Sequence, residues 1–301
     1  ADHIQVTPVA YDDRLKVWFK WENHQVTHSF KPRGALNKVL SLSRVELDRG
    51  LIACSAGNHG QGVALAARQT GAQVQVYVPE DAAQIKIEKM IALGAEVVKV
   101  PGLYGDAEAA AIRAAHDRGK TYVSPYNDPL VIAGAGTIAL EWLEQSPDVD
   151  TLLVPVGGGG LIAGVGSAAK GVRPDVKIVG VQSEASAYLH AEFYRRDMRE
   201  VIESPTLTDG LAGSVEPGSM TIELIHEVAD DVVLVTEDDV ARAIAYAYHR
   251  HGEVIEGSGA VGLAAVLAGK VASAGNVGLL VSGGNINADK HARICAEHAG
   301  I

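Results

Sequence analysis

A lysine in an apolar setting is the first residue whose type and surroundings suggest chemistry. Lys31 lies in residues 29–35, Ser-Phe-Lys-Pro-Arg-Gly-Ala, which precede a helical pattern. Pro32 suits the first position of a helix, and Phe30 supplies an apolar wall that disfavours the charged ammonium form. A desolvated amine acts as a nucleophile or a base. Taken alone, however, a lysine beside a proline is usually a solvated surface residue.

A polar turn follows the next apolar run. Residues 54–62 read Cys-Ser-Ala-Gly-Asn-His-Gly-Gln-Gly, after a strand-like run over 51–53 and before a helical segment. Backbone N–H groups at a helix start bind carboxylates, and Ser55 and Asn58 add side-chain donors. The alternative is an ordinary turn in which a serine or asparagine caps the helix.

Four consecutive glycines form the third candidate segment. Gly157, Gly158, Gly159 and Gly160 lie between the apolar run 152–156 and the helical residues 161–164. Successive N–H groups in such a loop converge on a phosphate, and the dipole of the following helix supports the negative charge. The segment lacks the lysine of a P-loop and the acidic strand end of a Rossmann fold. It therefore favours a phosphate group over a nucleotide.

A serine follows the last apolar run of the chain. Ser282 begins the sequence Ser-Gly-Gly-Asn directly after residues 279–281, Leu-Leu-Val. A hydroxyl at a strand end can meet a ring nitrogen, although this composition is equally typical of a simple turn. All four segments follow predicted strands, of which the first is an apolar run that contains Val17, Trp18, Phe19 and Trp21. Open α/β sheets bind ligands at the carboxyl ends of their strands. Their combination predicts one ligand site.

Short β-branched runs alternate with longer alanine-rich segments, which predicts an α/β fold with parallel sheet and right-handed crossovers. The predicted strands cover residues 73–78, 96–100, 151–156, 176–181, 232–235 and 278–281. The predicted helices cover residues 61–69, 82–93, 106–118, 137–145, 238–249 and 260–267. This number of strands favours two sheets over one wide sheet.

Composition excludes several classes of protein. The net charge of −11 comes without any cluster of basic residues, which argues against nucleic acid as a partner. The two cysteines, Cys54 and Cys295, have neither disulfide-framework nor zinc-site spacing, which favours a reducing cytoplasm. No apolar stretch approaches the roughly 20 residues of a membrane helix. The sequence thus predicts a cytoplasmic protein that binds neither nucleic acid nor membrane.

The whole chain resembles the fold-type II pyridoxal-phosphate family, in particular its threonine/serine dehydratase and serine racemase branch. The matching segments are residues 7–8, 22–23, 29–35, 55–61, 134–137, 157–160, 256–260 and 282–285. The resemblance implies a tryptophan synthase β-like fold of two open twisted three-layer α/β/α domains, with pyridoxal 5′-phosphate between them. Residues 1–48 plus 128–301 would form the large cofactor-binding domain, and residues 49–127 a small mobile domain. A homodimer or homotetramer is also implied.

The resemblance also implies a role for each candidate residue. Lys31 would hold the cofactor as a Schiff base and act as the catalytic base, while Phe30 would pack against the cofactor ring. The other implied cofactor contacts are Asn58 to the ring hydroxyl, Gly157, Gly158, Gly159, Gly160 and Leu161 to the phosphate, and Ser282 to the ring nitrogen. The implied substrate-binding residues are Ser55, Ala56, Asn58 and His59.

These roles imply β-elimination from L-threonine or L-serine, which gives 2-oxobutanoate or pyruvate and ammonia. Serine racemases resemble this turn but carry a second serine at the position of Ala56, and alanine has no proton to exchange. Metal-binding members have a Glu and an Asp where Gln182 and Tyr188 stand, so we expect no divalent-metal requirement. A neutral hydroxyl from Ser282 does not enforce a protonated ring, and β-elimination tolerates the weaker electron sink.

Other interpretations remain open. The family's Gly-Gln-Gly-Thr reads Gly-Ala-Gly-Thr at residues 134–137, so the substrate is open between threonine or serine and another 3-hydroxy amino acid such as hydroxyaspartate or phenylserine. Serine racemisation is a further alternative, and a non-catalytic ligand-binding protein on the same fold is another. The chain ends at Ile301, about where the family's catalytic region ends, so no regulatory domain that binds isoleucine is expected.

Overall fold

A computed structural model describes residues 3–271 and 276–300 of the chain. The chain forms two compact units: unit 1 contains Ala1–Ile4 and Lys31–Ala135, and unit 2 contains Gln5–Phe30 and Gly136–Ile301. The chain therefore passes from unit 2 into unit 1 between Phe30 and Lys31.

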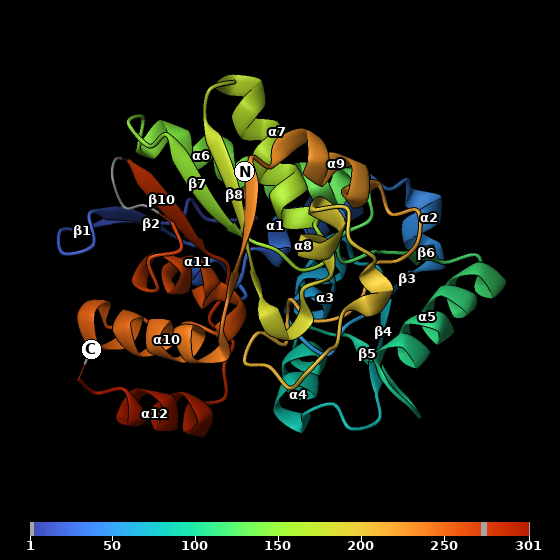
Figure 1. Ribbon diagram of the computed structural model, residues 1–301. Helices are drawn as coiled ribbons and strands as arrows, with labels where there is room; N and C mark the ends of the chain where they lie inside the picture. The colour runs from blue at the N-terminus through green and yellow to red at the C-terminus, as the bar shows by residue number, and fades with distance from the viewer. Residues whose placement is uncertain (1–2, 272–275, 301) are drawn as a thin grey trace. The chain divides into compact units, whose positions relative to one another are not determined.

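Unit 2 is built on a six-stranded sheet with the order β1-β2-β10-β7-β8-β9. Its strands are β1 (Val9–Asp12), β2 (Val17–Trp21), β7 (Thr151–Pro155), β8 (Lys177–Ser183), β9 (Asp231–Val235) and β10 (Val277–Val281). All neighbours pair in parallel except β1, which forms an antiparallel hairpin with β2. Figure 1 shows β10 beside β7 in the middle of this sheet, with β8 on the other side of β7. The carboxyl ends of the parallel strands therefore lie along one edge.

Helices cover both faces of the six-stranded sheet. Helices α6 (Pro129–Gln145) and α7 (Gly160–Val172) pack on one face, where the Trp142 ring fills the space beside Gly278 and Ile162 lies against Gly180. Helices α10 (Glu237–His251) and α11 (Gly257–Leu267) pack on the other face, against alternate strand residues such as Leu153 and Leu279. The alternation of side chains along each strand thus produces a three-layer α/β/α unit.

Shorter elements complete unit 2. They are the 3₁₀ turns η1 (Glu22–His24), η2 (Glu184–Ser186) and η3 (Met198–Glu200), and helices α8 (Tyr188–Phe193), α9 (Met220–Val228) and α12 (Ala288–Glu297). Helix α9 packs on α7, and α12 packs on α10 (Figure 1).

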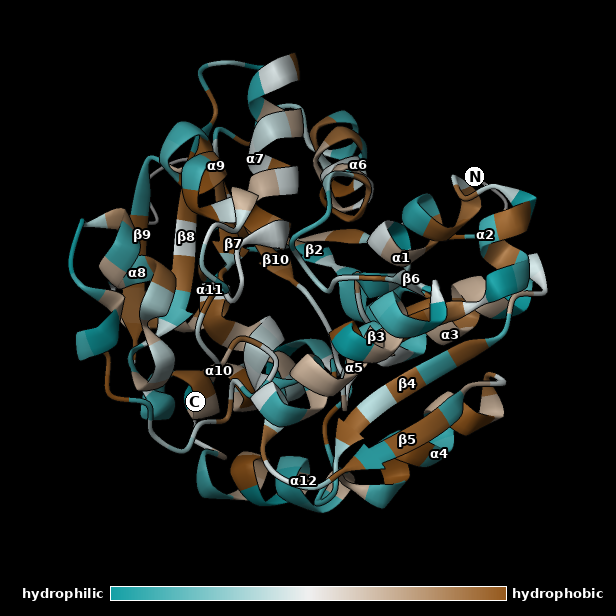
Figure 2. Cartoon of the chain, turned by 90° about the vertical axis from the view of Figure 1, so that its right-hand side faces the viewer, coloured by the Kyte–Doolittle hydropathy of each residue, from teal (hydrophilic) through white to brown (hydrophobic). Residues whose placement is uncertain are grey.

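Unit 1 contains a four-stranded parallel sheet with the order β5-β4-β3-β6. Its strands are β3 (Leu51–Cys54), β4 (Val74–Pro79), β5 (Glu96–Val100) and β6 (Thr121–Tyr122), and its helices are α1 (Lys31–Leu40), α2 (Arg44–Arg49), α3 (Asn58–Thr70), α4 (Gln84–Ala92) and α5 (Tyr104–Arg118). Helices α1, α3 and α4 share a core with one face of the sheet, and α5 covers the other face. Figure 2 shows the apolar residues of β4 and β5 as brown bands.

The structure confirms the predicted fold class, with two open three-layer α/β/α units. The predicted small domain, residues 49–127, lies within unit 1, which also contains residues 31–48 and 128–135. These flanking residues belong there because α1 lies against α3: a Cβ on Gly62 would come 3.1 Å from the Lys31 carbonyl carbon. The mobility of this unit stays a prediction. Across the described residues, no helix combines the length and apolar character needed to span a bilayer.

Candidate active site

Lys31 is the first residue of α1 in unit 1. Its side chain is half-buried, and the Nζ atom donates a hydrogen bond to the carbonyl oxygen of Pro125 at 3.0 Å. Pro125 lies in the segment that follows β6. The lysine amine is therefore held in one direction by a backbone acceptor, which carries no charge of its own.

The turn of residues 55–59 connects β3 to α3, as the sequence predicts. The Ser55 hydroxyl accepts a hydrogen bond from the Gly57 N–H at 3.1 Å. Gly57 occupies the N-cap position and supplies no side-chain cap, and the first N–H groups of an α-helix have no acceptor within the helix itself. Ser55, Ala56 and Asn58 are half-buried. The turn thus has the backbone arrangement of an anion site at a helix start.

His59 points into the interior of unit 1. Its side chain is buried, and Nε2 lies 2.8 Å from the carbonyl oxygen of Val123. A carbonyl only accepts hydrogen bonds, so Nε2 donates and Nδ1 carries the lone pair. Within the described residues Nδ1 has no hydrogen-bond partner. Burial, and then the positive charge of Lys31, lower the pKa of His59 to about 3. The imidazole is neutral, and any substrate contact of His59 would come from its backbone.

Unit 1 brings two predicted features together, Lys31 and the polar turn, with the segment that follows β6. Gly62, in the first turns of α3, packs against Lys31. A Cβ added to Gly62 would lie 3.1 to 3.3 Å from the carbonyl carbon, carbonyl oxygen and Cβ of Lys31. His59, in the same turns, is hydrogen-bonded to the carbonyl oxygen of Val123, and Lys31 is hydrogen-bonded to that of Pro125. The lysine, the polar turn and the segment after β6 are therefore neighbours in unit 1.

The four glycines form a loop between β7 and α7 in unit 2. Gly159 is the N-cap of α7 and has φ +87°, a left-handed conformation that favours glycine. A Cβ on Gly157 would lie 2.9 Å from the Leu211 Cα, so the backbone leaves no room for a side chain there. Within residues 3–271 and 276–300 no acceptor takes the N–H groups of residues 157–161. These donors and the helix start fit a phosphate group.

Ser282 follows β10 in unit 2 and is buried. Its hydroxyl lies 3.3 Å from the carbonyl oxygen of Ser258, and its own carbonyl accepts the Phe30 N–H at 3.0 Å. Gly259 packs closely against the same turn: a Cβ added to Gly259 would lie 2.5 Å from the carbonyl oxygen of Gly283. Hydrogen bonds to Ser258 and Phe30 therefore hold the turn in place, and Phe30 is the residue directly before Lys31.

Gln182 and Tyr188, which by resemblance stand where metal-binding members of the family have carboxylates, also lie in unit 2. Gln182 near the end of β8 accepts the backbone N–H of His190 at 2.9 Å, and its amide nitrogen is buried without a partner among the described residues. Tyr188 begins α8. In the described part of the chain no three His, Cys, Asp or Glu side chains group as metal ligands. The absence of a metal requirement stays a prediction.

Three supporting residues were missed by reasoning from the sequence. Pro125 holds the lysine through its backbone, and nothing in its local sequence marks this contact. Ser258 supports Ser282, and its place in the matching segment 256–260 was the available signal. Thr221 contacts the glycine loop from α9, and it lies in a helix that the sequence did not predict.

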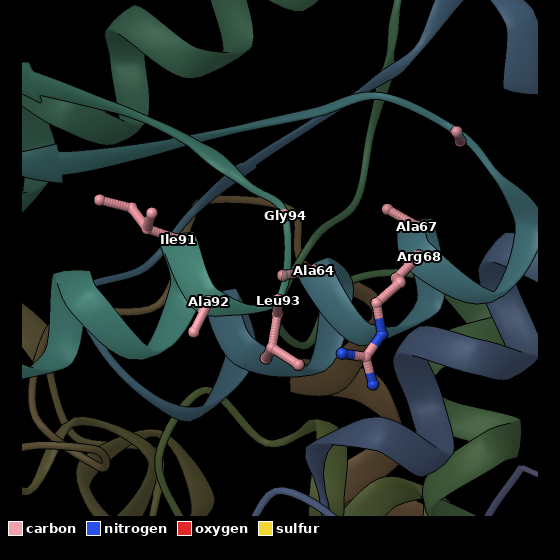
Figure 3. Close-up of a pocket in the computed structure, with 8 residues that line it drawn as sticks. Ala64, Ala67, Arg68, Ile91, Ala92, Leu93 and Gly94 are labelled. Carbon is pink, nitrogen blue, oxygen red and sulfur yellow. The ribbon is translucent and has the colours of Figure 1, made fainter.

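A pocket in unit 1 lies apart from these residues. It is formed by the second half of α3 and the end of α4, and its lining includes Ala67, Arg68, Ile91 and Leu93 (Figure 3). None of the predicted site residues is among the lining residues. This pocket is therefore not the predicted site.

Comparison with known proteins agrees with this fold and these residues. The chain belongs to the pyridoxal-phosphate dependent enzyme family, whose model matches residues 1–283. It is 44% identical to an L-threonine ammonia-lyase of Thermotoga maritima over 297 residues, which are 97% of this chain and 74% of the relative.

Solved structures of related enzymes are also similar. Threonine deaminase isoform 2 from Solanum lycopersicum matches with a TM-score of 0.88 and 33% identity, covering 100% of this chain and 90% of that one. Maize serine racemase matches with a TM-score of 0.89 and 30% identity, covering 99% and 94%. The predicted family and its cofactor, pyridoxal phosphate, are thereby confirmed.

Proposed function

We propose that this protein is an ammonia-lyase that converts L-threonine, L-serine or both to 2-oxobutanoate or pyruvate and ammonia by β-elimination. The observation that carries the proposal is the close packing of Lys31 on the first turns of α3, which follow a polar turn in which Ala56 supplies no second proton donor. One base and a carboxylate site are sufficient for elimination, whereas racemisation requires an acid on the opposite face of the substrate. The similarity to threonine ammonia-lyase and threonine deaminase supports the same reaction.

We assign the cofactor contacts to the residues that the sequence singles out. In unit 2 the backbone N–H groups of residues 157–161 would bind the phosphate, and Ser282 would face the ring nitrogen. Asn58 in unit 1 would bind the ring hydroxyl, and Lys31 would hold the cofactor covalently. Phe30 would pack on the ring. When bound, pyridoxal phosphate withdraws electrons from the bond at the substrate's Cα.

The protein's own residues perform the remaining tasks. The N–H groups at the start of α3, with Ser55, would bind and orient the substrate carboxylate. The amine of Lys31 would remove the Cα proton of the substrate as the general base. The carbonyl of Pro125 accepts a hydrogen bond from the lysine nitrogen and would hold the protonated amine, which would give its proton to the β-hydroxyl so that this group leaves as water.

One reaction screen tests the proposal. The purified protein with its cofactor is supplied with L-threonine, L-serine, hydroxyaspartate and phenylserine, and 2-oxo acid, ammonia and the chirality of the remaining substrate are measured. We expect equal amounts of 2-oxo acid and ammonia from threonine or serine. Product from hydroxyaspartate or phenylserine alone would refute the substrate assignment, and D-serine without 2-oxo acid would favour a racemase.

Serine racemisation is the second candidate, because a serine racemase has a closely similar fold. Ala56 counts against it. The homodimer or homotetramer and the cytoplasmic location remain predictions, the latter supported by two cysteines that are buried and unpaired in the structure.

A further inference from the structure

Thr221 contacts the glycine loop from outside the segments that the sequence singles out. It lies in the first turn of α9, and its hydroxyl is 2.8 Å from the carbonyl oxygen of Gly158. The Thr221 side chain is fully buried, and the neighbouring Ser219 is 2% exposed. A buried hydroxyl that is directed at one loop carbonyl has a defined structural task.

The hydrogen-bond directions in this cluster follow from the chemistry of the groups. The Gly158 carbonyl can only accept, so the Thr221 hydroxyl donates its single hydrogen to it. The hydroxyls of Ser219 and Thr221 lie 2.8 Å apart, and the donor between them must then be Ser219. Ser219 in turn accepts the backbone N–H of Thr221 at 3.4 Å. The chain of donors therefore ends at the Gly158 oxygen.

This hydrogen bond also fixes the direction of an N–H group. The carbonyl of Gly158 and the N–H of Gly159 belong to one planar trans peptide, so they point in opposite directions. With the oxygen held towards α9, the Gly159 N–H points away from α9. Gly159 is also held by packing, because an added Cβ would lie 2.8 Å from the Thr221 Cβ and 2.9 Å from Leu189.

We propose that Thr221 is a positioning residue that orients the Gly158–Gly159 peptide, so that the glycine loop presents its N–H groups to the phosphate of the cofactor. This inference rests on the proposed role of the loop in cofactor binding. A rotated peptide would turn the carbonyl oxygen towards the anion, where its partial negative charge repels the phosphate. Thr221 thus contributes to affinity for the phosphate group and to no other part of the cofactor.

Cofactor affinity tests the proposal without measuring turnover. The cofactor is removed, and the Kd values of pyridoxal phosphate and of pyridoxal, which lacks the phosphate, are measured by equilibrium dialysis. Thr221→Val removes the hydroxyl at nearly constant volume. We expect the Kd of pyridoxal phosphate to rise about five- to tenfold, which corresponds to one hydrogen bond. The Kd of pyridoxal should stay within about twofold, and Thr221→Ser should restore both values.

Two further variants make the outcome interpretable. Thr151→Val removes a hydroxyl that bonds to Asp150 at the opposite end of β7, and both of its Kd values should equal those of the wild type. Gly158→Asp places a carboxylate in the loop and should abolish the preference for the phosphorylated cofactor. If Gly158→Asp keeps that preference, the loop is not the phosphate site. In that case the proposed role of Thr221 is also refuted.

The inference alone is overturned if Gly158→Asp loses the preference while Thr221→Val binds pyridoxal phosphate like the wild type. An equal loss of affinity for both ligands in Thr221→Val also overturns it, because a purely structural role would weaken both. Thermal unfolding of the cofactor-free variants separates a folding defect from a defect in binding. If Thr221→Val fails to fold, Thr221→Ala and Thr221→Ser take its place in the same comparison.

Discussion

The backbone N–H of Phe30 donates a hydrogen bond to the carbonyl oxygen of Ser282 at 3.0 Å. Ser29 and Gly283 form an antiparallel bridge beside it, and the Gly284 N–H donates to the His28 carbonyl. The chain before Lys31 is therefore paired, residue by residue, with the turn after β10. This pairing fixes the end of the unit 2 segment that precedes Lys31, although the two paired segments are far apart in sequence.

Replacement of Lys31 by alanine should abolish 2-oxo acid formation, since no other amine would take the Cα proton. We expect a loss of at least about a thousandfold in kcat/KM, as is typical when a base and covalent anchor is removed. Initial rates of 2-oxo acid release provide the measurement. Lys38→Ala in the same helix, where Lys38 pairs with Asp128, is the control and should stay active. Retention of most activity in Lys31→Ala would refute the assigned role.

Replacement of Ala56 by serine should introduce racemisation of L-serine. The new hydroxyl supplies the proton donor that the turn lacks, at nearly constant volume in a half-buried position. Chiral chromatography of the remaining serine should reveal D-serine in Ala56→Ser and none in Ala56→Gly, which also lacks a proton. Equal D-serine from the wild type would contradict the argument.

Acid should destabilise the protein through His59. Burial lowers the pKa of His59 to about 3 in the folded chain, whereas an unfolded histidine titrates near 6.5. Between these values the unfolded chain binds a proton that the folded chain does not, so stability is lost as the pH falls below about 6.5. The contribution of His59 should lower the free energy of unfolding by about 2 kcal/mol at pH 5.

Urea unfolding of the cofactor-free protein at several pH values measures this effect. His59→Gln keeps a donor for the Val123 carbonyl but does not titrate, so its stability should depend less on pH in this range. The exposed His116 provides the control, because His116→Gln should keep the pH dependence of the wild type. If the free energy of unfolding of His59→Gln depends on pH as steeply as that of the wild type, His59 is not the source of the acid destabilisation.

Replacement of Gly157 by alanine should weaken cofactor binding and folding together. The added Cβ would come 2.9 Å from the Leu211 Cα, so the loop backbone must move. We expect a loss of about 1–3 kcal/mol in the free energy of unfolding. Gly171→Ala in α7 is the matched control, since nothing lies within 4 Å of its added Cβ, and it should be neutral or stabilising by up to about 1 kcal/mol. If the Gly157→Ala variant is as stable as the wild type and binds the cofactor equally well, the close approach of Leu211 to Gly157 does not constrain the loop.

Removal of divalent ions should leave turnover largely intact. Gln182 accepts a backbone N–H instead of offering a carboxylate, and Tyr188 offers a phenol. Rates before and after treatment with a chelator, and after addition of Mg²⁺, provide the measurement. A large loss that Mg²⁺ reverses would show a metal site that these residues do not suggest.

Much of the fold could be predicted from local sequence patterns. Strands such as β5 and β7, and helices such as α5 and α10, carry residue patterns that are long enough to be recognised. The strand β6 was missed because it has only two residues, and β1 was missed because it exists through its pairing with β2. Helices α9 and α12 were missed as well.

The sequence by itself determined the reactive residues and their immediate setting, because a glycine loop, a helix start or a lysine at a first turn depends on neighbours along the chain. Only the tertiary structure decided which supports they receive. Pro125, Thr221 and Ser258 each contact a site residue from a distant segment. The inward direction of His59 was decided in the same way. Such contacts arise when packed elements meet, and no local residue pattern encodes them.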